Sequence, residues 1–501
     1  MFYNITMLRL QDRRKRITRL AGIATVLAVT CCCACAAAPD FNLAGFASVS
    51  GMGLPTTTGG AGGPHVQVSN LTQLVSALQT NATRMVEVLT DIDLSPLANH
   101  SGGFPSDYPV GEIVVRSNKT IYSKSGAAIR RGSLRIGKPS PGPQQNIIIR
   151  NLKFRDLWVN DPSGNYDTYG WDYIHIEENS HHIWIDHCDF GQVYDGMIDV
   201  THGSDFITVS WNIFRGPQKK CSLVGHSDNN SAEDLGHLNV TYHHNWFDGV
   251  DERTPRMRFG NAHVFNMYCV DLGGRGIQST SRAATLVENS YFLHPESDSL
   301  PTAEVNGGAT GIVKVVNSII VNRPGQNVQF RQHGQSNFLF NAPFASAAPP
   351  YSYVPDPVAD VPQIVTNYAG IGKIGFELWQ WEQFTLQQLT NVAISGPEAT
   401  PAADGVNNFT KYAFGLAPLA PAPRPLIPLR FEQSEAVLTY RRPETATDVI
   451  YRIETSTDLL AWSAANLAQQ TVSTNGGVQI RELRYTGPVT SSRFFRVALE
   501  R

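Results

Sequence analysis

The sequence predicts an all-β protein built from a solenoid of stacked β rungs, an N-terminal helix that caps it, and a small C-terminal β-sandwich. Three observations favour this fold. Short apolar runs, each ending in a polar residue followed closely by an aromatic or apolar one, recur between residues 183 and 320. One amphipathic helical pattern precedes them, and alternating strand patterns follow a Pro-rich segment near residue 420. Repeats without helices between the strands are typical of a solenoid.

The first 38 residues have the order of a secretory signal. Basic residues at 13–19 precede an apolar stretch from Leu20 to about Val29, and small residues follow at 36–38. The apolar stretch is too short for a stable membrane span, and no later segment approaches 18 uninterrupted apolar residues. We therefore expect a secreted protein, extracellular or periplasmic, with no membrane span. Four cysteines between positions 31 and 35 leave attachment to a lipid as an alternative.

Composition limits the function further. Hydrophobic residues make up 42% of the 501 residues and charged residues 17%, which allows a large core. The net charge of −3 provides no basic field for nucleic acid, so an anionic ligand must be held by local cations. Beyond the signal, the three cysteines Cys188, Cys221 and Cys269 cannot staple a chain of this size, and we expect them to be buried apolar residues.

The helical pattern at 68–79 predicts one short amphipathic helix. Leu71, Leu74 and Leu78 recur at helical spacing, and Ser69 or Asn70 can cap the first turn. A helix at this place would cover the open end of the coil, which otherwise exposes the edges of its sheets.

The repeated runs have a recurrent polar position. Aligning the runs on Cys188, Asn212, Asn245, Asn266, Asn289 and Asn317 gives intervals of 24, 33, 21, 23 and 28 residues. Asparagine suits a turn of this kind because it tolerates the left-handed conformation. The irregular intervals indicate long loops on one side of the coil, where function usually lies. A β-sandwich is the competing topology, but it usually has more regular short turns.

Two carboxylates in the segment DGMID indicate a cation site. Asp195 and Asp199 would be about 13 Å apart in a straight strand, which is too far for one calcium ion. Gly196 allows the backbone to fold so that both side chains converge. Asp172, one rung earlier, could stack beside them, and three oxygen ligands would then form an open calcium site. The alternative is that these aspartates cap turns.

The histidines do not indicate a zinc site. In HHIWIDH, His181 and His187 share a strand face but lie about 20 Å apart, and His182 and Asp186 share the other face at about 13 Å. Neither spacing suits zinc. We expect these histidines to stack or to form structural hydrogen bonds.

The segment RTPRMR at 253–258 is a poor core strand. It holds Arg253, Arg256 and Arg258 around Pro255, which removes a backbone donor and forces a bend or a strand end. Because guanidinium groups grip carboxylates in a two-pronged fork, the segment is a candidate site for an acidic ligand. A solvated basic loop is the alternative.

Five blocks in order carry a family resemblance: WIDHCDF, DGMIDVTHGSDFITVSWNIF, KCSLVGHSD, VTYHHNWF and RTPRMRFGNAHVFNMY. Over roughly residues 45–375 the chain resembles the pectate lyases of polysaccharide lyase family 1. The resemblance implies a right-handed parallel β-helix that cleaves polygalacturonate by calcium-dependent β-elimination. It also implies pectin polysaccharide as the partner of a chain that we expect to be a monomer.

The resemblance also implies roles for individual residues. Asp172, Asp195 and Asp199 match the calcium ligands of the family. Lys220 matches a lysine that contacts substrate, Arg253 the arginine assigned as base, and Arg258 a second substrate-binding arginine, and we add Arg256 to the substrate-binding set. Some members have a further aspartate where this chain has Gly170, so the site is a variant with fewer protein ligands.

The proposed base raises a physical difficulty, because a guanidinium with a pKa above about 12 is rarely neutral. If Arg253 accepts a proton, nearby calcium and other cations must lower its pKa, and activity should favour alkaline pH. Retention of Asp195 and Asp199 argues against a calcium-independent pectin lyase. The complete set Lys220, Arg253 and Arg258 argues against a β-helix that only binds pectin.

The expected domain boundaries follow from composition. A pectate lyase domain is expected at 39–378, and a junction that ends in the Pro-rich segment 417–428 is expected at 379–428. Four alternating strand patterns, AVLTYRR, VIYRIETS, QIRELRY and SSRFFRVAL, predict an accessory β-sandwich at 429–501.

Overall fold

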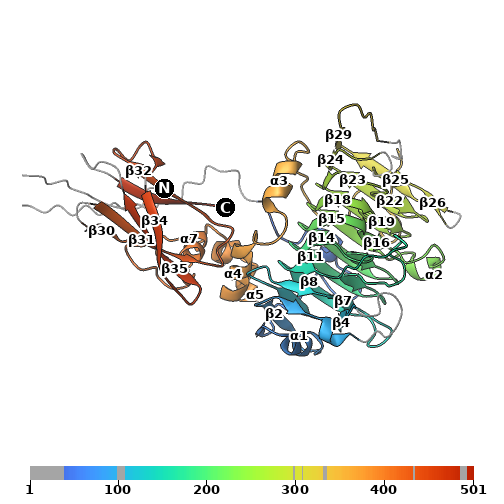
Figure 1. The fold of residues 1–501 in the computed structure, drawn as a ribbon, viewed down its shortest axis with the longest axis horizontal. Helices are drawn as coiled ribbons and strands as arrows, with labels where there is room; N and C mark the ends of the chain where they lie inside the picture. Colours follow the sequence, from blue (N-terminus) through green and yellow to red (C-terminus); the bar gives the residue numbers. More distant parts are fainter. Residues whose placement is uncertain are drawn as a thin grey trace, which may run out of the picture. The chain divides into compact units, whose positions relative to one another are not determined.

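The computed structural model describes residues 39–98, 108–296, 300–306, 309–330, 336–432, 435–465, 467–485 and 494–501. The signal expected at 1–38 lies outside these residues. They form two compact units, Phe41–Lys373 and Ile374–Arg501. In Figure 1 the first unit runs from the blue strands to the orange helix α3 (Val361–Tyr368).

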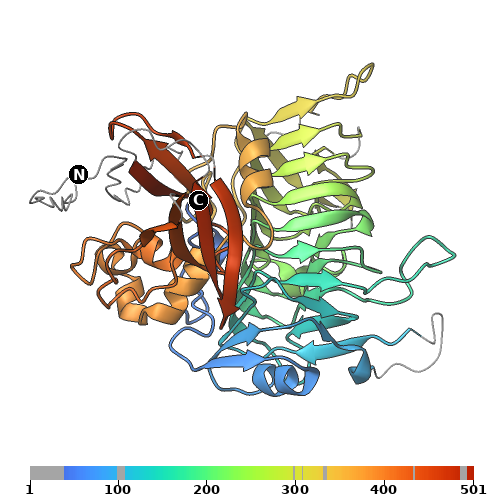
Figure 2. The ribbon, with the colours of Figure 1, turned by 60° about the vertical axis from the view of Figure 1, so that its left-hand side comes forward.

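The first unit is the predicted right-handed parallel β-helix. The chain visits three sheets in turn, so that β11, β12 and β13 make one rung and β14 begins the next. Figure 2 shows the rungs stacked from the blue end to the yellow end. Each strand pairs in parallel with its equivalent one rung away, as β11 does with β8 and β14.

On each rung the chain enters sheet 1 first, then sheet 3 and finally sheet 2. Among the described residues, sheet 1 contains β1 (His65–Val68), β2 (Arg84–Val88), β5 (Lys119–Tyr122), β8 (Gln145–Arg150), β11 (His181–Asp186), β14 (Asp205–Ser210), β17 (Asn239–His243), β20 (Asn261–Phe265), β23 (Ala284–Glu288) and β28 (Ile312–Val316). Sheet 3 contains β3 (Ile92–Asp93), β6 (Ala128–Arg130), β9 (Lys153–Arg155), β12 (Asp189–Phe190), β15 (Ile213–Lys220), β18 (Trp246–Glu252), β21 (Tyr268–Val270), β24 (Tyr291–Leu293) and β29 (Ile319–Val321). Sheet 2, which the chain enters last, contains β4 (Gly111–Val114), β7 (Gly132–Ile136), β10 (Ile174–Ile176), β13 (Ile198–Val200), β16 (Ser222–Val224), β19 (Arg256–Arg258) and β22 (Gln278–Thr280), and it ends in the short strands β25 (Thr302–Ala303), β26 (Val305–Asn306) and β27 (Ala309–Thr310).

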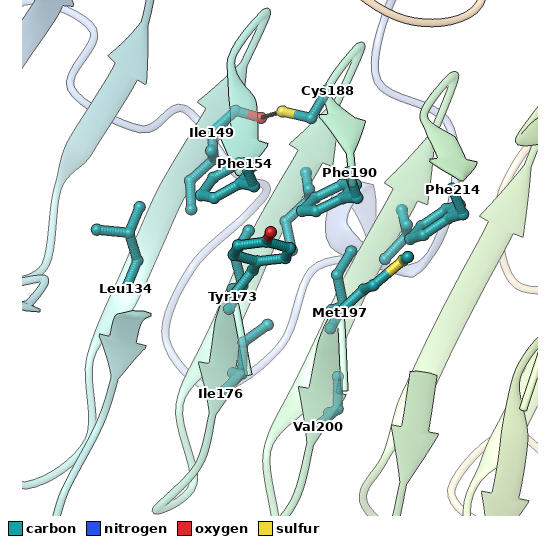
Figure 3. Close-up of a cluster of buried hydrophobic side chains, with 14 of the residues drawn as sticks. Leu134, Ile149, Phe154, Tyr173, Ile176, Cys188, Phe190, Met197, Val200 and Phe214 are labelled. Atoms are coloured by element: carbon teal, nitrogen blue, oxygen red, sulfur yellow. Dashed lines mark hydrogen bonds between the residues drawn. The ribbon is translucent and has the colours of Figure 1, made fainter. Parts of the chain in front are cut away.

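The interior repeats from rung to rung because alternate side chains of each strand point inward. Four phenylalanines of sheet 3 stack on one another with ring centroids 4.9, 5.1 and 4.5 Å apart: Phe154, Phe190, Phe214 and Phe247. Figure 3 shows the first three in this order, with Cys188 donating to the carbonyl of Ile149 at 3.7 Å. The three cysteines expected to be apolar are buried and free.

The turn after each sheet 1 strand corrects the predicted alignment. Residues in register across six rungs have φ between 44° and 57°: His187, Trp211, His244, Asn266, Asn289 and Asn317. Among these six, asparagine fills the left-handed position only in the last three turns, although Asn151, one rung before His187, also adopts it with φ 56°. In the earlier turns Asn212 and Asn245 lie one residue later, where Asn212 Nδ2 donates to Asn245 Oδ1 at 3.0 Å. The predicted alignment placed Cys188, Asn212 and Asn245 at the same position as the three later asparagines. It was therefore one residue out for the first three runs. Aromatic rings fill the left-handed position instead, with Trp211 stacked on His244 at 3.9 Å.

The predicted cap helix is α1 (Leu71–Leu78), and it packs next to β1 and β2 at the blue end of the coil in Figure 1. Asn70 caps it by accepting from the Gln73 N–H at 3.0 Å. Leu74 and Leu78 are buried in the core of the coil, so the helix covers the first rung as expected.

The outer faces of two sheets are covered by segments that the sequence pattern did not single out. The 3-10 helix η1 (Phe46–Ser48) packs on sheet 1, where Phe46 N donates to Thr241 Oγ1 at 3.0 Å. Helix α3 packs against Ile213, Trp246 and other residues of sheet 3. The outer face of sheet 2 instead carries polar and charged side chains, and the short helices η2 (Ser95–Leu97) and α2 (Ser231–Asp234) lie in the loops of the coil.

The second unit contains the predicted antiparallel sandwich. One sheet is formed by β30 (Leu429–Glu432), β31 (Glu435–Pro443), β35 (Val478–Tyr485) and β34 (Leu467–Asn475), and the other by β33 (Ser463–Ala464), β32 (Ile450–Ser456) and β36 (Phe494–Glu500). The structure places its boundary differently from the sequence pattern, between Lys373 and Ile374.

The segment expected as a junction is part of this second unit. It holds α4 (Gly375–Gln383), α5 (Leu386–Leu389), α6 (Val392–Ser395) and α7 (Asn408–Ala413). Phe376, Phe409 and Tyr412 of these helices share one core with Leu438 and Val497 of the strands. The Pro-rich segment nearby concealed these helices in the sequence. Their apolar residues find their partners only in the strands of the sandwich, which come later in the chain. Among the described residues, no helix is long and apolar enough to cross a membrane.

Candidate active site

The predicted site residues gather along one edge of sheet 2. Asp172, Asp195, Lys220 and Arg253 lie just before β10, β13, β16 and β19, four successive strands of that sheet. Asp199 lies on β13 itself. Asp172, Asp195, Lys220 and Arg253 therefore come from four different rungs, each at the point where the chain passes from sheet 3 to sheet 2, and Asp199 shares the rung of Asp195.

The fold brings Asp172 and Asp199 together around Gly196. Asp172 Oδ1 accepts from the Gly196 N–H at 2.7 Å, and Asp199 Oδ1 accepts from the Leu223 N–H at 3.1 Å. A Cβ atom at position 196 would lie 2.3 Å from Asp199 Oδ1 and 2.8 Å from Asp172 Oδ1. Glycine is needed at this position because a side chain would occupy the space between the two carboxylates.

The aspartates repel one another in a poorly solvated place. Burial, and then the charge of Asp195, raises the pKa of Asp172 to about 7. Burial and the charges of Asp172 and Asp195 raise the pKa of Asp199 well above its usual value. Burial also raises the pKa of Asp195, against the opposing charge of Lys220. Three carboxylates destabilised by one another would be stabilised by a shared cation.

These residues fit calcium by their chemistry. Carboxylate oxygens are the ligands that Ca²⁺ prefers, and the space beside Gly196 lies between two of them. In the part of the chain that the structure describes, no three acidic, histidine or cysteine side chains already converge as a complete metal-binding group. His175 Nδ1 lies 2.9 Å from Asp172 Oδ2, and burial, with the nearby Arg135, lowers its pKa to about 4. A neutral imidazole therefore borders the aspartates.

Lys220 is buried and lies between two carboxylates. Its Nζ donates to Asp195 Oδ1 at 3.1 Å, to the Tyr166 carbonyl at 2.9 Å and to Asp167 Oδ1. Tyr166 and Asp167 belong to the connection between β9 and β10, and no pattern in the sequence indicated that they lie here. Asp167 carries no motif that could have indicated its role, because its contact depends on how this long connection folds back.

Arg253 lies in the bend between β18 and β19. Its φ is 64°, a costly conformation for a residue other than glycine, and the Arg253 N–H donates to the Arg275 carbonyl at 2.7 Å. Its charge lowers the pKa of Asp172, Asp195 and Asp199, so the guanidinium lies near all three. Its Nε is buried and has no hydrogen-bond acceptor among the described residues.

Arg256 and Arg258 lie on β19 beyond Arg253. Arg258 Nε donates to Asp228 Oδ1 at 2.7 Å, and Nη1 donates to the Gly225 carbonyl at 2.8 Å, so this side chain is rigidly held. Burial and the charges of Arg258 and Arg253 lower the pKa of Arg256 to about 10. Asp228 belongs to the block KCSLVGHSD, which was a signal for its role as a support.

The histidines serve structure, as predicted. His181 and His182 hydrogen-bond through their Nδ1 atoms at 2.8 Å, and His187 stacks on Trp211 with ring centroids 5.8 Å apart. His263 lies 3.0 Å from Glu288 Oε2. None of these four histidines borders Asp172, Asp195 or Asp199.

Comparison with known proteins identifies the family of the chain. A family model described as pectate lyase matches residues 17–374. The pectate trisaccharide-lyase of Thermotoga maritima is 34% identical over 385 residues, in an alignment that covers 72% of this chain and 98% of that protein. Pectate lyase B of Paenibacillus amylolyticus is 31% identical over 344 residues, in an alignment that covers 55% of this chain and 84% of that protein.

The solved structures give the same fold. The pectate lyase of Paenibacillus sp. 0602 superposes with a TM-score of 0.54 at 24% identity, covering 66% of this chain and 96% of that one.

Proposed function

The chain belongs to the pectate lyase family of polysaccharide lyases, and from this premise we propose that it cleaves α-1,4-linked polygalacturonate by calcium-assisted β-elimination. The observation that carries the proposal is the meeting of three mutually repelling aspartates with Lys220 and Arg253 at one edge of sheet 2. Such a site offers places both for a cation and for the carboxylate of a uronate.

The reaction removes the proton from C5 of a galacturonate residue and breaks the bond between C4 and the glycosidic oxygen. The electron pair from the C5–H bond forms the C4=C5 double bond, and the leaving oxygen takes up a proton. The products are a shortened chain and an oligogalacturonate with a 4,5-unsaturated end.

The cationic side chains hold the polymer. Lys220, Arg256 and Arg258 are proposed to bind uronate carboxylates, because charged hydrogen bonds to carboxylates fix both position and orientation. The hydrogen bond from Arg258 Nε to Asp228 limits the movement of the guanidinium and fixes one of its edges. A uronate held in this way would present its C5 proton at a constant place.

Arg253 is proposed to accept the C5 proton. Its guanidinium lies near the aspartates, where the uronate carboxylate would be neutralised. A base must lie within hydrogen-bond distance of the proton it removes, and the bent backbone at Arg253 holds the side chain at this edge.

Asp172, Asp195 and Asp199 would hold the calcium ion. Calcium bound there would withdraw negative charge from the uronate carboxylate and so make the neighbouring C5 proton more acidic. We further propose that the protein is secreted as a monomer, since its polymeric substrate lies outside cells and residues 1–38 have the order of a signal.

The test is the formation of unsaturated uronide from polygalacturonate, followed by ultraviolet absorbance with calcium and with excess chelator. We expect turnover with calcium and its loss with chelator. Calorimetric titration of calcium should show weakened binding in Asp199→Asn and unchanged binding in Asp271→Asn, an exposed aspartate that pairs with Arg323. Full turnover in chelator would contradict the calcium assignment, and release of saturated products would contradict elimination.

A further inference from the structure

All the donors of Lys220 already have acceptors within the protein. A lysine ammonium carries three N–H donors. Here the three acceptors are Asp195 Oδ1 at 3.1 Å, the Tyr166 carbonyl at 2.9 Å, and Asp167 Oδ1. A uronate carboxylate can therefore bind Lys220 fully only if it replaces one of them.

The Tyr166 carbonyl is held in place by its own loop. Asp161 accepts from the backbone N–H groups of Ser163 at 2.9 Å and Tyr166 at 3.1 Å, and from the Tyr194 hydroxyl at 2.7 Å. The Tyr166 ring packs edge-on against Tyr194 with centroids 5.3 Å apart. Moving this carbonyl would break the turn that Asp161 organises.

The two carboxylates differ in their exposure. The Asp195 side chain is 21% exposed and lies beside the other aspartates of the site, whereas the Asp167 side chain is 70% exposed. Lys220 itself is 7% exposed. Asp167 can leave the ammonium by rotating into solvent, which neither of the other acceptors can do.

We propose that Asp167 occupies, on Lys220, the position that the substrate's carboxylate takes, and that it swings away when the polymer binds. This inference rests on the proposed function, in which Lys220 binds a uronate. Asp167 acts as a specificity residue: a carboxylate on the ligand can replace it, whereas a neutral sugar or a methyl ester offers the ammonium no charge in exchange.

The test compares Asp167→Asn and Asp167→Ala with the matched control Asp156→Asn. Asp156 lies in the same connection, its side chain is exposed, and it pairs with Arg130 at 2.5 Å rather than with Lys220. All three variants change the net charge by one unit. We expect both Asp167 variants to lower KM for polygalacturonate about two- to five-fold, the range of an exposed ion pair, and the control to keep the wild-type KM.

Two further measurements separate this effect from a structural one. The difference in KM should shrink as ionic strength rises, because salt screens exposed charges. It should also vanish when Asp167→Ala is combined with Lys220→Met, since Asp167 would then have no ammonium to cover. Calorimetric binding of oligogalacturonates gives the same comparison without turnover.

An unchanged or raised KM in both Asp167 variants would overturn the proposal, as would an equal effect in the Lys220→Met background. The proposed function fails separately, if the wild-type protein forms no unsaturated product. In that case tighter binding of oligogalacturonate by the Asp167 variants would still support the replacement of Asp167 by a carboxylate.

Discussion

Arg253 combines a strained backbone with a buried Nε that has no hydrogen-bond acceptor among the described residues. A left-handed arginine costs free energy that the fold must supply through the hydrogen bonds on both sides of it. Strain of this kind persists where it places a side chain that a relaxed backbone would not. Arg258, on a regular strand, is instead held by Asp228 through its side chain. The two arginines therefore differ in what their replacement should change.

Arg253→Lys should abolish turnover and leave substrate binding largely intact. Lysine keeps the charge but loses the planar fork and moves the nitrogen, so a positioned proton acceptor is lost. We expect kcat to fall about 10²–10⁴-fold. Arg258→Lys should mainly raise KM, because its proposed task is to hold a carboxylate. Steady-state kinetics on polygalacturonate at saturating calcium measure both, and a near-normal kcat in Arg253→Lys would mean that another group is the base.

Asp186, in the motif WIDH, contributes to stability rather than to the site. Burial alone would raise its pKa, but the charges of Arg150 and His187 outweigh burial and lower it to about 2. Arg150 Nε donates to Asp186 Oδ2 at 2.6 Å, and both side chains are buried. Because the folded-state pKa is depressed, the ionised carboxylate stabilises the fold above the unfolded-state value near 4, and this stabilisation is lost as the pH falls toward about 2.

Asp186→Asn should therefore lower the free energy of unfolding at pH 7 by about 3–5 kcal/mol, since Arg150 is left as a buried charge without its counter-ion. The difference from wild type should narrow as the pH falls from about 4 to about 2. Thermal unfolding across this range measures it. Asp271→Asn, which removes an exposed ion pair, should cost about 0–1 kcal/mol at pH 7. A destabilisation of Asp186→Asn that stays constant with pH would contradict the assignment.

At the scale of the elements, each rung is specified by its neighbours. Side chains in equivalent positions stack in columns, such as the phenylalanines of sheet 3 and the rings at the left-handed turn position. Asn212 and Asn245 form a separate column next to that turn, inside the coil. A column of polar side chains in the interior is stable only when each side chain forms hydrogen bonds with the next one.

The two kinds of asparagine should respond differently to glycine. Asn317 is exposed with φ 47°, a conformation that glycine adopts freely, so Asn317→Gly should change stability by less than about 0.5 kcal/mol. Asn245 Oδ1 accepts from Asn212 N at 2.9 Å and Nδ2 at 3.0 Å, and Asn245→Gly leaves these buried donors unsatisfied at about 1–3 kcal/mol each. Melting temperatures of the two variants test this contrast, and similar losses in both would show that the register is misassigned.

At the scale of the whole molecule, the chain consists of two compact units with separate cores. The core of the second unit includes Phe376, Phe409 and Tyr412, which precede its first strand. A unit can fold alone only if its apolar faces are covered by its own residues. The place at which the chain is cut should therefore decide whether the β-helix remains soluble.

A chain of residues 39–373 should fold cooperatively and retain lyase activity, whereas a chain of residues 39–428 should aggregate or melt over a broad range. The longer chain keeps the apolar helix faces but loses the strands that cover them. Size-exclusion chromatography and thermal melts followed by circular dichroism compare the two. Equal behaviour of both chains would mean that residues 374–428 form a stable structure without the sandwich.

Local patterns in the sequence determined the class of fold and most of the candidate site. The recurrent apolar runs predicted the solenoid, the spacing of Leu71, Leu74 and Leu78 predicted the cap helix, and RTPRMR marked the arginine-rich bend. These features depend on residues close in the chain, so periodicity and residue chemistry suffice to recognise them. The family resemblance then indicated which aspartates and which lysine belong with the arginines.

Only the tertiary structure decided the features that depend on residues far apart in the chain. It moved the turn alignment by one residue, because stacked rings can fill a left-handed position that asparagine usually takes. It assigned the helices of 375–413 to the second unit, and it placed Asp167 on Lys220. The physical reason is common to all three. A turn ring, an apolar helix face and an exposed aspartate each have several adequate partners in principle, and the packing of distant rungs and strands determines which one they meet.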